Sequence, residues 1–257
     1  MEKLKLNYSH DKSVAGIIMD DGKGNVLDAV MMNELQHLLD SFREKNNIKL
    51  ITIEGAGKHF SFGASVEEHT KEKAPNMLES FHKLFYTILD IGIPTAAKVS
   101  GQCLGGGMEI ALICNFIFAD QSAVFGQPEI VLGVFPPPAS LLLPLKIGNS
   151  RAEELLITGK SIKAERANTI GLLNALFDDR SQMEAGVEEW IVKSILPKSA
   201  SSLRYATKAS RSFMSHIIMK FLPELQKIYV DGLMQTHDAN EGINAFLEKR
   251  KAEWNNC

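Results

Sequence analysis

Apolar positions in the first half of the chain follow two alternating patterns. Short apolar runs bounded by turn residues predict β-strands, and they cover residues 14–19, 50–53, 95–99 and 116–119. Between these runs, apolar residues recur at a spacing of three or four, which predicts amphipathic helices over residues 27–43, 77–89 and 108–114. The last strand is apolar throughout, which is typical of a strand covered on both faces. The alternation of strand and helix indicates an α/β fold.

The second half of the chain loses the strand pattern and becomes nearly all helical. The spacing of its apolar residues predicts helices over residues 151–157, 163–170, 183–196, 201–213, 222–235 and 241–253. We therefore divide the chain into an α/β core over residues 1–197 and a helical C-terminal region over residues 198–257.

The composition is that of an ordinary globular protein that can bury a large core. Of the 257 residues, 45% are apolar and 23% are charged. The net charge of −3 gives no global positive field, so we expect neither nucleic acid nor a membrane as a partner. The chain also lacks the sequence patterns of a P-loop, a dinucleotide-binding turn and a serine-hydrolase elbow.

Cysteine usage and the first residues of the chain predict a cytoplasmic protein. Cys103, Cys114 and Cys257 have no spacing typical of a zinc site, and we expect no metal. The chain begins without the apolar core of a signal peptide. No stretch has the roughly 20 apolar residues that span a bilayer.

A glycine run opens the predicted helix at residue 108. Gly105, Gly106 and Gly107 precede Met108 and Glu109. The first N–H groups of a helix lack acceptors within the helix, and its dipole favours negative charge there. Glycines let a ligand oxygen approach that backbone closely, so the run suits a developing oxyanion. Close packing of the helix against a strand explains the run equally well.

Two further segments add to this signal. The loop over residues 60–65 follows a strand, and its small residues leave a backbone N–H accessible, although a plain surface turn has the same composition. The segment over residues 125–129 places Glu129 in an apolar stretch, twenty residues beyond Glu109. A lone glutamate there is more often part of a salt bridge. Two carboxyl groups in apolar sequence, however, can have their pKa values driven apart by burial and mutual repulsion.

The ordered set of these motifs resembles the enoyl-CoA hydratase (crotonase) superfamily. The resemblance is carried by residues 60–64, 98–112, 125–133 and 241–250, so it runs almost from end to end. It implies an α/β, crotonase-like (ClpP/crotonase) ββα superhelix. It also implies that the C-terminal helices mediate self-association as a homotrimer or a dimer of trimers.

Carried over by motif, the resemblance assigns the candidate site. The backbone N–H groups of Ala64 and Gly106 would bind the thioester carbonyl, and Glu109 and Glu129 would act as catalytic acid and base. Possession of both carboxyl groups favours a hydratase, because water addition needs a base for water and an acid for carbon. Coenzyme A is part of the acyl-CoA substrate, so no separate cofactor is implied. Lys58 and Lys249 are candidates for contact with its phosphates.

Two departures from the general family pattern resemble one branch, the cyclohexa-1,5-diene-1-carbonyl-CoA hydratases of anaerobic benzoyl-CoA degradation. Ser65 stands where the family commonly has aspartate, and residues 133–140 contain a run of three prolines, which stiffens the backbone and removes N–H donors. The branch implies 1,4-addition of water to a ring diene, giving 6-hydroxycyclohex-1-ene-1-carbonyl-CoA. The expected substrate pocket comprises Phe62, Ser65, Phe135, Pro136 and Pro137.

Other functions on the same scaffold remain open from the sequence. One is a general enoyl-CoA hydratase or isomerase of fatty-acid oxidation, and another is a thioester hydrolase. A third is a non-catalytic crotonase-fold binding protein, which the acidic balance and the intact carboxyl pair disfavour. The products formed from an acyl-CoA would discriminate among them.

Overall fold

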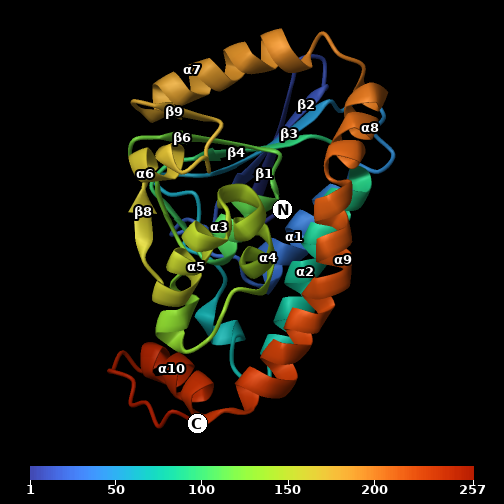
Figure 1. The fold of residues 1–257 in the computed structure, drawn as a ribbon. Coiled ribbons are helices and arrows are strands. Elements are labelled where there is room, and N and C mark those ends of the chain that lie inside the picture. The colour runs from blue at the N-terminus through green and yellow to red at the C-terminus, as the bar shows by residue number, and fades with distance from the viewer.

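The computed structural model describes residues 1–257 as two β-sheets surrounded by helices (Figure 1). The larger sheet contains, in spatial order, β1 (Leu4–Ser9), β2 (Val14–Met19), β3 (Leu50–Gly55), β4 (Thr95–Val99), β6 (Phe116–Asp120) and β9 (Ala175–Phe177). Only β1 runs antiparallel to its neighbour. The smaller sheet contains β5 (Gln102–Leu104), β7 (Val124–Gly126) and β8 (Ser161–Lys163). The prediction of an α/β fold is confirmed.

Ten α-helices and several short helical turns cover the sheets. The α-helices are α1 (Ala29–Ser41), α2 (Ala74–Ile91), α3 (Gly106–Ile113), α4 (Pro137–Ile147), α5 (Asn149–Thr158), α6 (Ala164–Thr169), α7 (Arg180–Trp190), α8 (Ala200–Ser210), α9 (Ser212–Lys227) and α10 (His237–Leu247). The short turns are η1 (Val66–Glu68), η2 (Pro128–Leu132), η3 (Ile191–Ile195), η4 (Ile228–Gly232) and η5 (Leu233–Gln235). None of the helices combines the length and apolar character that crossing a membrane requires.

Side chains that alternate along the large sheet bury both of its faces. On β3, Ile51 and Ile53 point into the main core of 53 residues, whereas Leu50 points to the opposite face. That opposite face packs against α7 and η3 in a second cluster of eight buried residues. Covering both faces explains why these strands are apolar at nearly every position.

The structure confirms the predicted strands and most predicted helices and adds elements that the pattern missed. The last two helices differ from the prediction: α9 begins at Ser212, ten residues before the predicted start, and α10 ends at Leu247 instead of residue 253. Strands β2 and β4 have the predicted bounds, and α2 extends the predicted helix by three residues at its start and two at its end. The missed elements are β1, the three-residue strands β5, β7, β8 and β9, and helix α4. Helix α4 begins at Pro137, because proline is compatible with the first turn of a helix, where no N–H is needed.

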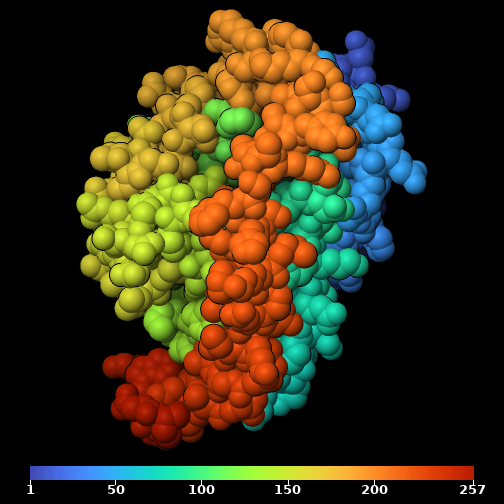
Figure 2. Space-filling model, turned by 45° about the vertical axis from the view of Figure 1, so that its right-hand side comes forward, coloured from blue at the N-terminus to red at the C-terminus, as the bar shows by residue number.

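The C-terminal helices lie along one side of the core instead of standing apart from it. Figure 1 shows α8 and α9 running past α2 toward α10, and Figure 2 shows the same orange and red segment lying across the surface. Helix α9 packs against α2 and α4. Ile218, Leu222 and Tyr229 belong to the main core cluster. The predicted boundary at residue 197 falls in a turn between η3 and α8.

A buried histidine connects α2 to α9. The His82 side chain is 1% exposed, and its Nδ1 lies 2.7 Å from Oε1 of Gln226, which accepts the hydrogen bond. Its Nε2 has no partner. Burial lowers the pKa of His82 to about 4, with the Gln226 hydrogen bond opposing the shift. His82 therefore stays neutral in the folded protein at pH values where an unfolded histidine, with a pKa of about 6.5, is protonated.

We expect His82 to make the protein less stable in mild acid. Between the folded pKa and the unfolded pKa, only the unfolded state binds the proton, so the stabilisation is complete above about pH 6.5 and is lost as pH falls toward 4. From pH 7 to pH 5 this loss is about 2 kcal/mol. Denaturant unfolding at both pH values should show a smaller acid loss in His82→Gln than in wild type. The exposed His216, replaced by Gln, is the matched control, and an equal acid loss in all three proteins would contradict the assignment.

Candidate active site

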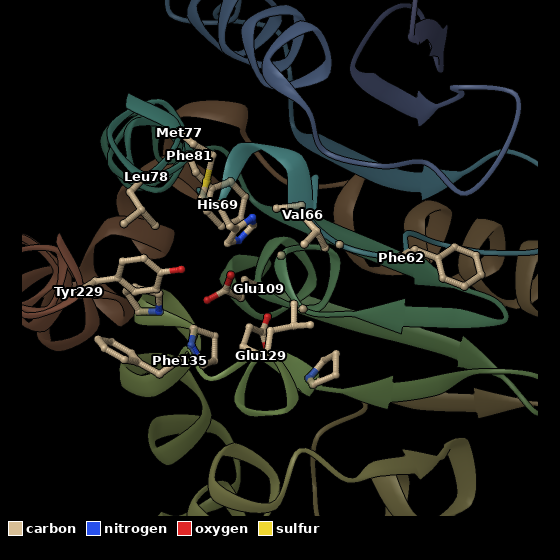
Figure 3. A pocket seen from close by; sticks show the side chains of 18 residues that line it. Phe62, Val66, His69, Met77, Leu78, Phe81, Glu109, Glu129, Phe135 and Tyr229 are labelled. Atoms are coloured by element: carbon tan, nitrogen blue, oxygen red, sulfur yellow. The ribbon is translucent and has the colours of Figure 1, made fainter. Parts of the chain in front are cut away.

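A cavity lies where the glycine turn before α3, the loop after β3, and helices α2, α4 and η4 meet (Figure 3). Its volume is about 80 Å³, and it is partly open to solvent. Its lining comprises Phe62, Gly63, Ala64, Val66, His69, Met77, Leu78, Phe81, Gly105, Gly106, Glu109, Pro128, Glu129, Leu132, Phe135, Pro136, Pro137 and Tyr229. Two carboxyl groups and two backbone turns thus face one largely apolar space.

The space around the glycine run is compatible with both of the interpretations that the sequence left open. A Cβ on Gly107 would lie 2.5 Å from Cβ of Ser61, so this glycine is needed for close packing. Gly105 has a φ of 49°, and a Cβ there would lie 2.7 Å from Oε1 of Glu129. A Cβ on Gly106 would lie 3.1 Å from the Ala64 nitrogen. The first two residues of the run therefore let the backbone approach the cavity, and the third lets α3 pack against the neighbouring loop.

The loop over residues 60–64 is held in place by its own hydrogen bonds. Ser61 Oγ donates to the Asn25 carbonyl at 2.7 Å and accepts from the Gly63 N–H at 3.0 Å. The Ala64 N–H has no protein acceptor, and the Gly106 N–H lies in the first turn of α3, where N–H groups lack acceptors within the helix. Two free donors from contacting segments can therefore bind one negatively charged oxygen.

Lys146 and Arg211 stabilise the opposite end of α3. Lys146 Nζ donates to the Cys114 carbonyl at 3.0 Å, and Arg211 Nη2 donates to the Ile113 carbonyl at 2.5 Å. Burial lowers the pKa of Lys146 to about 8 and that of Arg211 to about 10. Cations at a helix C-terminus complement its dipole. The arrangement leaves the positive end of α3 directed at the cavity.

Glu109 and Glu129 approach the cavity from α3 and η2. Glu109 is 4% exposed, and its Oε1 accepts from the Ala139 N–H at 2.8 Å. With its amide oriented to donate, the buried Gln127 places its nitrogen 3.1 Å from both oxygens of Glu129. Glu129 is partly exposed, but the surface it exposes faces the cavity. Neither carboxyl group has a salt-bridge partner among the ion pairs of the chain.

Burial raises the pKa of both carboxyl groups. The pKa of Glu109 lies well above the ordinary range, first because of burial and second because of the charge on Glu129, while the Ala139 N–H opposes the shift. Burial raises the pKa of Glu129 to about 8. Two such groups in one cavity resist ionising together. Both groups are therefore mostly protonated near neutral pH, and loss of one proton, which for Glu129 occurs near pH 8, leaves one group as an acid and the other as a base.

The structure places some of the other predicted site residues at the cavity and some elsewhere. Phe62, Phe135, Pro136 and Pro137 line it as predicted. Ser65 does not line it, and its carbonyl oxygen instead accepts from Nδ1 of His69 at 2.7 Å. Lys58 and Lys249 are exposed and also lie outside the cavity lining. No three histidine, cysteine or acidic side chains converge where they could hold a metal ion.

Sequence reasoning missed two polar residues of the cavity. Tyr229 reaches it from η4, a hundred residues beyond Glu129, and no local pattern connects the two. His69 lies in a polar cluster that follows the loop at residue 65, and it also lines the cavity. Such a cluster in a sequence is more often the solvated start of a helix than part of a site. Nδ1 of His69 donates to Ser65, and burial lowers the pKa of His69, so its Nε2 is a hydrogen-bond acceptor.

Comparison with known proteins agrees with this geometry. A model of the enoyl-CoA hydratase/isomerase family matches residues 9–257. The chain is 41% identical to a cyclohexa-1,5-dienecarbonyl-CoA hydratase of Thauera aromatica, over 98% of this chain and 97% of that protein. It is 34% identical to a probable enoyl-CoA hydratase of Rhizobium meliloti, over 90% and 89% of the two chains.

Solved structures confirm the predicted crotonase-like fold. An enoyl-CoA hydratase from Bacillus halodurans superposes with a TM-score of 0.87 at 19% identity, covering 95% of this chain and 99% of that chain. The family match and the two relatives span almost the whole of the chain. The protein is therefore an enzyme of the enoyl-CoA hydratase/isomerase family.

Proposed function

We propose that this enzyme is a hydratase that adds water to cyclohexa-1,5-diene-1-carbonyl-CoA and forms 6-hydroxycyclohex-1-ene-1-carbonyl-CoA. The observation that carries the proposal is the buried carboxyl pair, Glu109 and Glu129, facing one cavity beside two free backbone donors. The similarity to the Thauera aromatica hydratase supports the choice of a ring diene. This reaction would be a step in the anaerobic degradation of aromatic acids through benzoyl-CoA.

The backbone donors act first in the proposed mechanism. The N–H groups of Ala64 and Gly106 bind the thioester carbonyl oxygen and stabilise the negative charge that it gains when water attacks the ring. The ionised member of the carboxyl pair takes a proton from the attacking water, and the protonated member supplies one to carbon. In a ring diene the negative charge extends over the second double bond. The proton can then be added at the far carbon of the diene, which gives the 1,4-product.

The shape of the cavity supports a compact acyl group. Beyond the carboxyl pair, bulky side chains of α2, η4 and the segment before α4 close the space, among them Phe81, Phe135 and Tyr229 (Figure 3). Phe81 and Tyr229 are at most 2% exposed, so the wall is fixed by packing. A flat six-membered ring needs less depth than an extended fatty-acyl chain. Phe62, which is 46% exposed, lies away from Tyr229, toward the side where coenzyme A would leave the cavity.

The first test is the identity of the product. Mass spectrometry after incubation with cyclohexa-1,5-diene-1-carbonyl-CoA should show the gain of one water, with little gain on crotonyl-CoA. Fast hydration of crotonyl-CoA alone would identify a general enoyl-CoA hydratase and refute the ring substrate. Conversion without gain of water, or release of free coenzyme A, would replace hydration by isomerisation or hydrolysis.

Replacing either carboxyl group by its amide should abolish most turnover. Glu109→Gln and Glu129→Gln each remove a proton-transfer group, and general acid–base catalysis of this kind contributes about 10²- to 10⁴-fold. We expect kcat to fall by that factor while the dissociation constant of an acyl-CoA changes little, because glutamine retains the shape of the side chain. The exposed Glu67 in η1 provides a matched Glu→Gln control. Near-full hydration by either single variant would disprove the two-carboxyl mechanism.

The raised pKa values predict that activity is low in acid and rises toward pH 8. Because the pKa of Glu129 is raised to about 8 and that of Glu109 is also raised, raising the pH toward 8 removes the first of the two protons that the pair holds at neutral pH. The base is then formed, so kcat/KM should rise about tenfold per pH unit below this value and level off above it. A profile of kcat/KM from pH 6 to 9.5 tests this expectation. A rate that stays constant to pH 9.5 would show that no carboxyl group of raised pKa takes part.

A further inference from the structure

The hydroxyl of Tyr229 is a buried polar group without a protein partner. The residue is 1% exposed, and its Oη makes no hydrogen bond. Leaving a buried hydroxyl unpaired is unfavourable, because its hydrogen bonds to water are lost and not replaced. In contrast, Tyr8 Oη accepts a hydrogen bond from Lys45 Nζ at 2.6 Å, and Tyr205 is 77% exposed. Such an unpaired group at a cavity indicates a partner that arrives with a ligand.

Packing fixes the direction of the Tyr229 hydroxyl. Its ring meets Phe135 edge to face, with centroids 5.4 Å apart and an interplanar angle of 63°. The residue belongs to the π-helical turn η4, which follows α9 directly, and such turns occur frequently at functional sites. Figure 3 shows the hydroxyl pointing into the cavity toward Glu109. Burial, followed by the charges of Glu129 and Glu109, raises the pKa of Tyr229, so its hydroxyl remains a donor.

Among the oxygen atoms of the proposed reaction, one is a suitable hydrogen-bond partner for the Tyr229 hydroxyl. The acyl group brings only its thioester carbonyl oxygen into the cavity, and the free N–H groups of Ala64 and Gly106 are placed to bind that oxygen. The rest of the ring is hydrocarbon. The remaining oxygen is the one that moves between water and the ring, and it must pass between the two carboxyl groups that Tyr229 faces.

We propose that Tyr229 Oη donates a hydrogen bond to the transferred oxygen, as the attacking water in hydration and as the product hydroxyl in the reverse reaction. This inference rests on the proposed hydratase function and makes Tyr229 a substrate-contacting catalytic residue. The C-terminal helices then complete the site, because they supply a donor that selects for an oxygen on the ring.

Binding to two matched ligands tests the contact without turnover. In a Glu109→Gln background, calorimetry compares 6-hydroxycyclohex-1-ene-1-carbonyl-CoA with cyclohex-1-ene-1-carbonyl-CoA, which lacks only the hydroxyl. Adding Tyr229→Phe should weaken binding of the hydroxylated ligand about three- to tenfold, the range expected for one neutral hydrogen bond. Binding of the other ligand should stay within about twofold. Tyr86→Phe, a replacement on α2 outside the cavity, should affect neither ligand.

Each other outcome has a distinct meaning. Equal weakening of both ligands would show that Tyr229 only shapes the cavity, and no change for either would show that it makes no contact. Both results overturn this inference and leave the hydratase function intact. If the parent protein binds neither ligand, the proposed function fails together with it.

The stability of the free protein gives an independent check. Removal of an unpaired buried hydroxyl should leave the Tm of Tyr229→Phe unchanged or higher, because the penalty for burying the hydroxyl disappears. A Tm several degrees lower would reveal a structural partner for the hydroxyl and overturn the inference.

Discussion

The site depends on a close approach between two backbone turns that side chains would prevent. A Cβ on Gly63 would lie 2.9 Å from the Leu104 carbonyl oxygen, and one on Gly107 would lie 2.5 Å from Cβ of Ser61. The contact is reinforced by an isolated bridge between Ser61 and Cys103. It connects the loop after β3 to the turn before α3, and thereby brings two free N–H groups to one space. Geometry made from backbone alone is rigid, because no side-chain rotamer has to be ordered when a ligand arrives.

The cavity gives its two carboxyl groups few of the contacts that would stabilise their charged forms. Pro136, Pro137 and Pro138 have no N–H, so Ala139 is the first residue of α4 that can donate, and its N–H is taken by Glu109. A helix start with ordinary residues would offer several donors and would lower the pKa of a carboxyl group beside it. The proline run thus limits the hydrogen bonding that would otherwise counteract burial. The raised pKa values therefore follow from the missing N–H donors of the proline run as well as from burial.

The sequence predicted the elements that have local signals and missed those defined by distant contacts. Strands β2 and β4 are long enough to show an apolar run, whereas β5, β7 and β8 have three residues each and exist because they pair with one another. The motif that contains Glu109 and Glu129 could be read directly. Ser65 was expected in the pocket because it differs from the family pattern, but pattern alone does not tell whether a side chain or a carbonyl group faces a cavity. Tyr229 reaches the site only through the packing of the C-terminal helices.

The C-terminal helices close the cavity with Tyr229, and its unpaired hydroxyl makes the protein without a ligand less stable. Phenylalanine would fill the position of Tyr229 and keep the edge-to-face contact with Phe135, without burying an unpaired hydroxyl. A fold selected only for stability would therefore favour phenylalanine. The backbone donors and the carboxyl pair lie in the α/β core, and in the proposed function they act on the thioester, which every acyl-CoA has in common. Discrimination among acyl groups must then come from the wall opposite the core, and Tyr229 is the one residue of that wall that combines a fixed ring with a free hydrogen-bond donor.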